Sequence, residues 1–195
     1  MANLHFFYGT MGAAKSTKLI QDRYNFIQNG TRVYVIKPKT DRHPEPKITT
    51  RIGLECPAAI HEKLNVDKLR EIPDFAISAV VLVDEVQFFS APDIDALVTL
   101  ADTYKLRVFC YGLMVDVNEK LFPASKHLIE VGAKLHELPV SCQMPGCQNL
   151  ANHHLRYDSN GTVIRNGDAI CVDDGRVKYM SVCRTCYDKA LGHHR

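Results

Sequence analysis

The chain has 195 residues, of which 46% are hydrophobic and 24% are charged, as in an ordinary soluble globular protein that is large enough to bury a core. Its formal net charge of +2 is too small to favour a nucleic acid or a membrane surface as the partner. No apolar run is long enough to cross a bilayer and the N-terminus does not have the pattern of a signal peptide, so we expect a cytoplasmic protein.

The first part of the chain alternates strand-like and helix-like segments. Short runs of β-branched and aromatic residues are typical of buried parallel strands. Strand–helix alternation predicts a parallel α/β sheet with both faces covered. The expected strands are Leu4–Tyr8, Arg32–Ile36, Ala79–Val83 and Leu106–Gly112.

Two helices are expected between these strands. In the first, apolar residues recur at helical spacing over residues 19–27, and Asn29-Gly30 follows as a stop signal. The second begins with Ser90 as a candidate N-cap, and Asp93 stands three residues after it. The polar, proline-rich residues 40–47 are expected to form a loop.

The composition changes after Pro139. The remaining segment holds most of the cysteines and contains turn signals at residues 159–161 and 173–175, which favour short hairpins. We therefore expect a phosphate-loop α/β domain over residues 1–139 and a small metal-binding domain over residues 140–195.

The stretch "GTMGAAKST" between the first strand and the first helix is close to the phosphate-loop pattern G-x-x-x-x-G-K-[ST]. Backbone N–H groups and the positive helix end there would hold a phosphate. Lys15 would reach the β- and γ-phosphates, and the Ser16 hydroxyl would ligate Mg²⁺. The candidate ATP-binding residues of the loop are Gly9, Thr10, Met11, Gly12, Ala13, Ala14, Lys15, Ser16 and Thr17.

Ala14 occupies the place of the second glycine of that pattern. If the loop needs a positive φ there, alanine adds roughly 1–2 kcal/mol of strain. Gly12 would take up some of the required flexibility. We interpret the loop as a functional phosphate site that is weaker than a standard one.

Asp84 and Glu85 follow the third expected strand, in "VVLVDEVQFF". In a phosphate-loop fold this strand end faces the loop, so a carboxylate there can hold Mg²⁺. The second acid can take a proton from an attacking hydroxyl. The alternative is a solvated turn, and the neighbouring phosphate loop favours the functional interpretation.

Two close cysteine pairs lie in the C-terminal part: Cys142 with Cys147, and Cys183 with Cys186. Such pairs separated by a hairpin are the usual arrangement of a tetrahedral structural Zn²⁺ site. Cys110, in an expected core strand, is interpreted as a small buried hydrophobe. The adjacent His153-His154 are interpreted as solvent-facing polar residues rather than metal ligands.

Several motifs coincide in order and spacing: G-x-M-x-x-x-K-S-T, D-E-x-Q-F-F, "YGL" and K-Y-x-S-V-C-R-x-C-Y. Over nearly the whole chain they resemble the type II thymidine kinases, the tetrameric zinc-containing family. The resemblance implies a RecA-like phosphate-loop sheet with a small C-terminal zinc-binding domain. It also implies ATP- and Mg²⁺-dependent phosphorylation of the thymidine 5′-hydroxyl by a homotetramer.

The same resemblance implies roles for individual residues. Asp84 matches the acid near Mg²⁺, Glu85 the catalytic base, and Arg42 an arginine near the phosphate and sugar. A segment from Gly167 to Tyr179, which includes Val172, matches a lasso that closes over thymine. The four paired cysteines match the zinc ligands. The residues that match the thymine pocket are Met11, Phe88, Phe122, Val172 and Tyr179.

Some residues depart from the family pattern: Ala14, and Met114, Val115 and Val117 in "YGLMVDVNEKLF". The leading hypothesis is an ATP-dependent kinase acting on thymidine and on deoxyuridine, which takes a pyrimidine deoxynucleoside and no nucleic acid. One alternative is a non-catalytic, regulatory nucleotide-binding relative, which Ala14 motivates. Another is a zinc-ribbon nucleic-acid binder, which the near-neutral charge disfavours.

Overall fold

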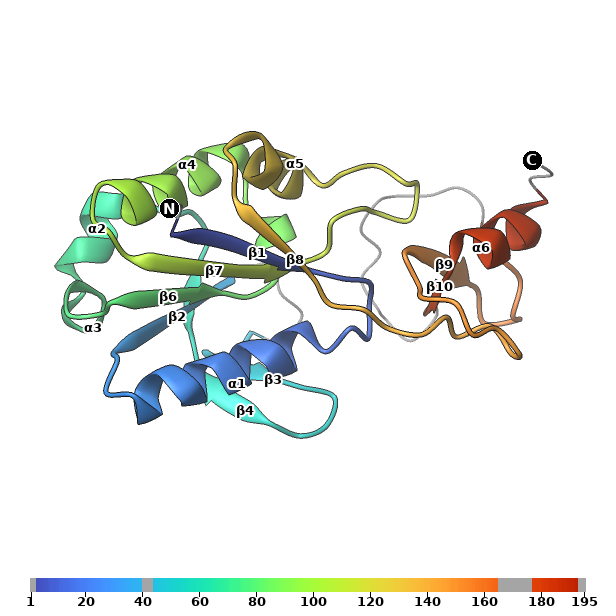
Figure 1. Cartoon of the computed structure of the whole chain (residues 1–195), viewed down its shortest axis with the longest axis horizontal. Helices are drawn as coiled ribbons and strands as arrows, with labels where there is room; N and C mark the ends of the chain where they lie inside the picture. The colour runs from blue at the N-terminus through green and yellow to red at the C-terminus, as the bar shows by residue number, and fades with distance from the viewer. Residues whose placement is uncertain (1–2, 40–43, 165–176, 193–195) are drawn as a thin grey trace.

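The computed structural model describes residues 3–39, 44–164 and 177–192. Within them, six strands form a central sheet in the order β5-β2-β6-β7-β1-β8, and every adjacent pair is parallel (Figure 1). The fold class predicted from the sequence is confirmed, with all four expected strands present. The strands are β1 (Leu4–Tyr8), β2 (Val33–Pro38), β5 (Ala59–His61), β6 (Val80–Val83), β7 (Arg107–Gly112) and β8 (Lys134–Glu137).

Helices cover both faces of this sheet. Helices α4 (Ala91–Asp102) and α5 (Pro123–Glu130) bury one face. Helix α1 (Lys15–Gln28) and the hairpin of β3 (Lys47–Thr49) and β4 (Glu55–Pro57) lie on the other. Because each face has its own buried cluster, the β6 residues Val80–Val83 are all buried, as expected of a central parallel strand.

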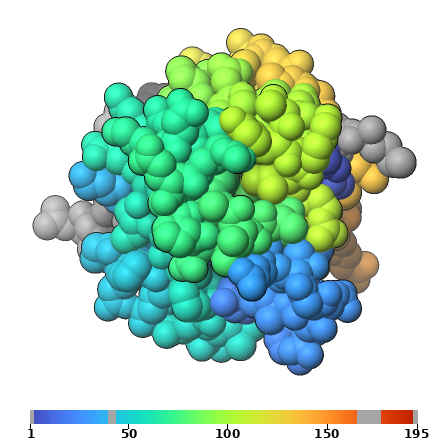
Figure 2. Space-filling view, turned by 90° about the vertical axis from the view of Figure 1, so that its left-hand side faces the viewer, coloured from blue at the N-terminus to red at the C-terminus, as the bar shows by residue number. Residues whose placement is uncertain are grey.

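Three short helical segments complete this part: α2 (Val66–Glu71), α3 (Pro73–Ala76) and η1 (Val86–Phe88). Figure 2 shows the end of the molecule remote from the C-terminal module, where the blue end of α1 lies beside the teal-to-green surface of α2, α3 and α4. The amino ends of the parallel strands lie toward this end (Figure 1). Ligands of such sheets bind at the carboxyl ends of the strands, so we expect the site at the opposite end of the sheet.

The start of α4 confirms the predicted cap. The Asp93 carboxylate accepts hydrogen bonds from the Ser90 backbone N–H at 2.9 Å and from the Ser90 hydroxyl at 2.6 Å. Its other oxygen accepts from the Leu64 N–H at 2.7 Å. The carboxylate is buried and joins the helix start to the loop between β5 and α2.

The end of α1 also follows the prediction, since Gly30 adopts a positive φ of 71° just after the helix. The apolar residues of α1 are not all buried: Leu19 lies in the core, whereas Tyr24 is 57% and Ile27 is 41% exposed. The helical spacing is confirmed, but part of the apolar face has no cover within this chain's described residues.

The C-terminal module contains the antiparallel pair β9 (His153–Tyr157) and β10 (Lys178–Val182), followed by helix α6 (Arg184–Leu191). Its buried cluster includes Leu155, Val182 and Tyr187. The predicted turn at residues 159–161 is confirmed, with Asp158 accepting from the Asn160 and Thr162 N–H groups. The turn predicted at residues 173–175 lies outside the described residues.

The division into domains at residues 139 and 140 stays a prediction. Among the helices of residues 3–39, 44–164 and 177–192, none combines the length and apolar character needed to cross a membrane.

Candidate active site

The phosphate loop connects β1 to α1, and its backbone geometry accounts for the glycines at positions 9 and 12. A Cβ at Gly9 would lie 2.6 Å from the Leu138 carbonyl oxygen and 2.7 Å from the Ala13 Cβ, so only glycine fits. Gly12 has a φ of +82° and Ala14 a φ of +55°. Strain was predicted at Ala14 on the condition that its φ is positive, and the φ is positive. The loop therefore carries the strain of a non-glycine residue in the left-handed region.

Lys15 is the first residue of α1 and is only 8% exposed. Its Nζ donates to the carbonyl oxygens of Thr10, at 2.9 Å, and of Gly9, at 3.2 Å. Burial lowers the pKa of Lys15, while the charges of Glu85 and Asp84 act to raise it. The lysine therefore lies within the electrostatic field of both acids.

Ser16 and Asp84 come together at the same edge of the sheet. The Ser16 hydroxyl donates to the Asp84 carboxylate, at 3.0 Å to Oδ2 and 3.3 Å to Oδ1. Asp84 follows β6 and the phosphate loop follows β1, two parallel strands separated by β7. Their carboxyl ends therefore meet at one edge. A hydroxyl and a carboxylate oxygen are ligands that Mg²⁺ accepts beside phosphate oxygens.

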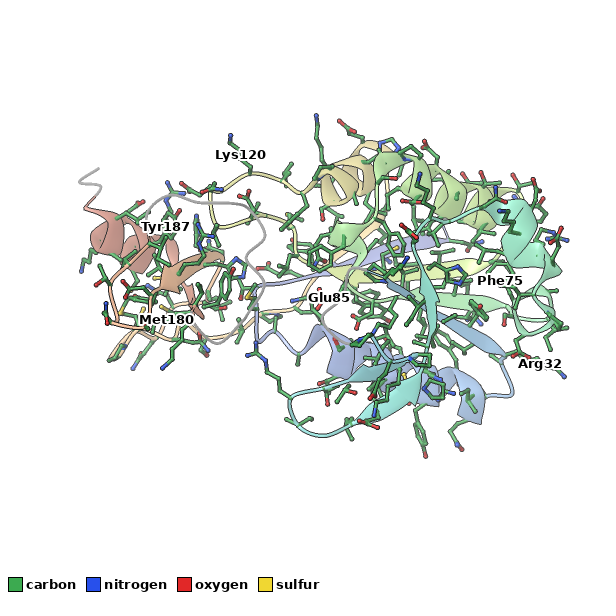
Figure 3. The ribbon with its side chains drawn as sticks, turned by 180° about the vertical axis from the view of Figure 1, so that it is seen from behind. Arg32, Phe75, Glu85, Lys120, Met180 and Tyr187 are labelled. Carbon is green, nitrogen blue, oxygen red and sulfur yellow. The ribbon has the colours of Figure 1, made fainter. Side chains whose placement is uncertain are left out.

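Glu85 lies between the parallel sheet and the C-terminal module (Figure 3). Its backbone is left-handed, with a φ of +47°. Its carboxylate accepts a hydrogen bond of 2.6 Å from the Gln87 side chain. The other end of the buried Gln87 amide accepts from the Leu113 N–H at 3.0 Å. Gln87 thus fixes the direction of the Glu85 carboxylate relative to the end of β7.

A Cβ at Gly112 would lie 2.5 Å from the Gln87 Oε1, so the glycine at the end of β7 makes room for this amide. The sequence motif D-E-x-Q-F-F contained Gln87, but no role was predicted for it. The charge of Arg51, for which no role was predicted either, acts to lower the pKa of Lys15.

Two of the aromatic residues predicted to bind a nucleoside base follow β6 and β7. Phe88 is half-buried in η1, which packs against α5. Phe122 is the buried residue just before α5. The packing of η1 on α5 therefore brings the segments that carry Phe88 and Phe122 together.

Met11 and Tyr179 are associated through β10. The Ser181 hydroxyl donates to the Met11 carbonyl oxygen at 2.6 Å. Tyr179 lies two residues before Ser181 on the strand and so shares its face. Arg42, Val172 and residues 167–176 of the predicted lasso lie outside the described residues.

The interpretation of His153-His154 as solvent-facing is wrong for His154. This side chain is 4% exposed, and its Nε2 accepts a hydrogen bond from the Met11 N–H at 2.8 Å. Burial, with smaller contributions from the charges of Lys15 and His153, lowers the pKa of His154 to about 4. Neighbours on a strand face opposite sides, so only one of the pair can face the phosphate loop. His153 lies on the other face and contacts Glu119.

The cysteine cluster has the geometry of a metal site. The Sγ atoms of Cys142, Cys147, Cys183 and Cys186 all lie within 4.8 Å of one another. Those of Cys147 and Cys183 are 3.7 Å apart, near the edge of about 3.8 Å of a sulfur tetrahedron around zinc. The Cys186 backbone N–H lowers the pKa of the Cys183 thiol to about 6, which favours the thiolate that binds metal. The residues fit Zn²⁺. Cys110, as predicted, is fully buried and has no place in this cluster.

Comparisons with known proteins agree along the whole length of the chain. The family model described as "Thymidine kinase" matches residues 2–187. A thymidine kinase of Vibrio vulnificus is 36% identical over 198 residues, covering 98% of this chain and 100% of the relative. A thymidine kinase of Aliivibrio fischeri is 35% identical over 195 residues, with the same coverage. One from Yersinia pestis is 36% identical over 195 residues, covering 98% of this chain and 97% of the relative.

Proposed function

Because the chain belongs to the thymidine kinase family, we propose that it transfers the γ-phosphoryl group of ATP to the 5′-hydroxyl of thymidine, and also of deoxyuridine. The observation that carries the proposal is the meeting of three groups at one edge of the sheet. These are the buried Lys15, the Ser16–Asp84 pair and the Glu85 carboxylate. Phosphoryl transfer requires positioning, charge stabilisation and a base, and these groups supply all three.

On the phosphate side, Lys15 exchanges its contacts with the Gly9 and Thr10 carbonyl oxygens for the β- and γ-phosphates of ATP. The loop N–H groups and the start of α1 add positive potential at the same place. Ser16 and Asp84 would hold Mg²⁺, whose charge, when bound, offsets that of the phosphates.

On the acceptor side, Glu85 takes the proton of the nucleoside hydroxyl as the hydroxyl oxygen forms its bond to the γ-phosphorus. The bond from that phosphorus to the β–γ bridging oxygen breaks, and ADP leaves with the electron pair. The hydrogen bond from Gln87 holds the Glu85 carboxylate in one direction. A fixed base needs little reorganisation to reach the hydroxyl.

We place the base of the nucleoside between the two parts of the chain. Met11, Phe88, Phe122 and Tyr179 supply apolar and aromatic surface suited to a flat ring with a methyl group. Val172 and the rest of the lasso would close over it and exclude water. The zinc held by the cysteines would keep this module folded.

The assembly that we propose is a homotetramer, as the family resemblance implies. The exposed Tyr24 and Ile27 on α1 supply apolar surface for a subunit contact. Light scattering on the eluted protein tests this directly. The cytoplasm is the compartment that we propose, because thiols placed for zinc stay reduced there.

Glu85→Gln tests the proposed function. The amide keeps the size of the side chain but cannot accept the proton, so we expect kcat with thymidine to fall at least 10²-fold, at the lower end of what a general base contributes. ATP affinity and thermal unfolding should remain as in the wild type. Retained activity would remove Glu85 from the role of base.

A second candidate function is that of a non-catalytic nucleotide-binding relative, which the strained Ala14 favours. A coupled assay with ATP and four deoxynucleosides separates the two candidates. Turnover with thymidine supports the kinase, and ATP binding without turnover of any nucleoside supports the relative.

A further inference from the structure

The backbone of Met11 is held on both sides by the β9–β10 hairpin. Its N–H donates to the His154 Nε2 at 2.8 Å, and its carbonyl oxygen accepts from the Ser181 hydroxyl at 2.6 Å. His154 and Ser181 are direct partners across the two strands. They are 4% and 1% exposed. A residue of the phosphate loop is therefore fixed by two buried side chains that lie more than 140 positions further along the chain.

The hydrogen bond to His154 defines the state of that side chain. Because Nε2 accepts a proton from an amide, it carries none itself, and the ring is the neutral tautomer with its hydrogen on Nδ1. Burial keeps the pKa of His154 well below its usual value, which agrees with a neutral ring. The acceptor is thus available to Met11 at neutral pH.

The position of Ser181 depends in turn on the cysteine cluster. The Ser181 N–H donates to the Gln143 side-chain oxygen at 2.7 Å, and the Gln143 N–H donates to the Ser181 carbonyl oxygen at 2.9 Å. Gln143 adjoins Cys142, and Ser181 lies two residues before Cys183. A metal that joins Cys142 to Cys183 therefore fixes both ends of this pairing.

The module also contacts the α/β part at a second place. The Tyr187 hydroxyl donates to the Val117 carbonyl oxygen at 3.1 Å, and Glu119 accepts from the Arg184 guanidinium and contacts His153. Figure 3 shows Tyr187 in the C-terminal module and Lys120 on the loop that reaches toward it. Removal of the Met11 contacts would therefore leave the module attached.

We propose that His154 and Ser181 are positioning residues that hold the phosphate loop in its nucleotide-binding conformation through Met11. The inference rests on the proposed binding of ATP at this loop. Fixing the Met11 peptide groups directs the chain into Gly12 and Ala14, which adopt positive φ values of 82° and 55°. The loop is strained at Ala14, and contacts from a second module offset its tendency to relax. The zinc-binding module thus contributes to ATP binding through the backbone of Met11.

The test measures ATP affinity by titration calorimetry in the absence of nucleoside. His154→Leu and Ser181→Ala each leave a Met11 backbone group without its partner, which should weaken ATP binding about tenfold. His154→Gln restores an acceptor near the place of Nε2 and should bind ATP within about twofold of the wild type.

Ser125→Ala is the matched control for Ser181→Ala. Ser125 is also buried, and its hydroxyl donates at the same 2.6 Å to the Leu113 carbonyl oxygen, which is not part of the phosphate loop. Its loss should lower the unfolding temperature to a similar extent without changing ATP affinity. A loss of ATP affinity in Ser181→Ala but not in Ser125→Ala is therefore not caused by a general loss of stability.

Removal of zinc by a chelator is the second measurement, with ATP affinity and the far-ultraviolet spectrum as readouts. We expect the affinity of the wild type to fall at least to that of Ser181→Ala, because loss of zinc releases Ser181 and, where the module unfolds, His154 as well. ATP affinities of His154→Leu and Ser181→Ala equal to that of Ser125→Ala would overturn the inference, and if His154→Leu does not fold, Ser181→Ala alone decides. A wild type that does not bind ATP would instead refute the proposed function.

Discussion

Ala14→Gly is the substitution whose effect follows most directly from the backbone. Ala14 has a φ of 55° and a ψ of 30°. The left-handed conformation costs an L-residue about 1–2 kcal/mol, which glycine avoids. Glycine in turn loses about 0.5–1 kcal/mol more backbone entropy on folding. Ala14 is exposed, so the removal of its Cβ uncovers no core. The net expectation is a stability gain of about 1 kcal/mol.

The assay is urea unfolding of wild type and variant, with ATP affinity measured in parallel. If the loop keeps its conformation when nucleotide binds, the strain is relieved equally in both states. We then expect the unfolding free energy to rise while ATP affinity changes less than about fivefold. Gly12→Ala is the matched reverse change: Gly12 has a φ of 82°, and its added Cβ would meet nothing within 4 Å. It should lose about 1 kcal/mol for the same reason.

An unfolding free energy of Ala14→Gly equal to or below that of the wild type would refute this reasoning. A different outcome would bear on function: ATP binding that is undetectable in the wild type and strong in the variant. That result would favour the regulatory relative over the kinase. A kinase binds ATP in every catalytic cycle, so its wild-type loop cannot require Ala14→Gly in order to bind.

Three further changes test other parts of the structure. With a pKa of about 4 in place of 6.5, neutral His154 contributes stability that is complete above pH 6.5 and lost by about pH 4. Relative to His154→Gln, the wild type should lose about 3 kcal/mol of unfolding free energy across that range, and parallel pH profiles would exclude this role. Asp93→Ala leaves three donors unpaired and should lower the unfolding free energy by about 3 kcal/mol in urea, whereas a loss below about 1 kcal/mol would contradict the cap. Gly112→Ala should displace Gln87 and reduce kcat about tenfold or more with ATP affinity unchanged; an unaltered kcat would show that Gln87 does not orient Glu85.

The sequence predicted the central strands because burial on both faces leaves a continuous apolar run, as in β6. The same principle explains the strands that it missed. β8 reads Lys134-Leu135-His136-Glu137 and is largely exposed at one edge of the sheet, and β5 has only three residues at the other edge. Edge strands take their structure from a neighbour, which a single sequence does not display.

Much of the candidate site was also predictable, because its main parts are local. A loop between a strand and a helix places Lys15 and Ser16, and a strand end places Asp84. Gln87 and His154 were not predicted, since their roles depend on contacts with residues far away in the sequence. Side chains alternate along a strand, so the sequence predicts that His153 and His154 lie on opposite faces of β9. Only tertiary packing decides which of the two contacts Met11.

Ala14 and Glu85 both adopt positive φ values on either side of the proposed reaction centre. Strained residues persist only where their surroundings hold them, and buried polar side chains lie close to both of these in the sequence or in space. Gln87 bonds Glu85 and the end of β7, while His154 and Ser181 bond the residue that leads into Gly12 and Ala14. The phosphate loop is thus held by a distant strand pair, and Glu85 by its own turn, which Gln87 ties to the residue after β7. It follows that substitutions in these supporting residues should affect kcat or ATP affinity more than their modest effect on stability would suggest.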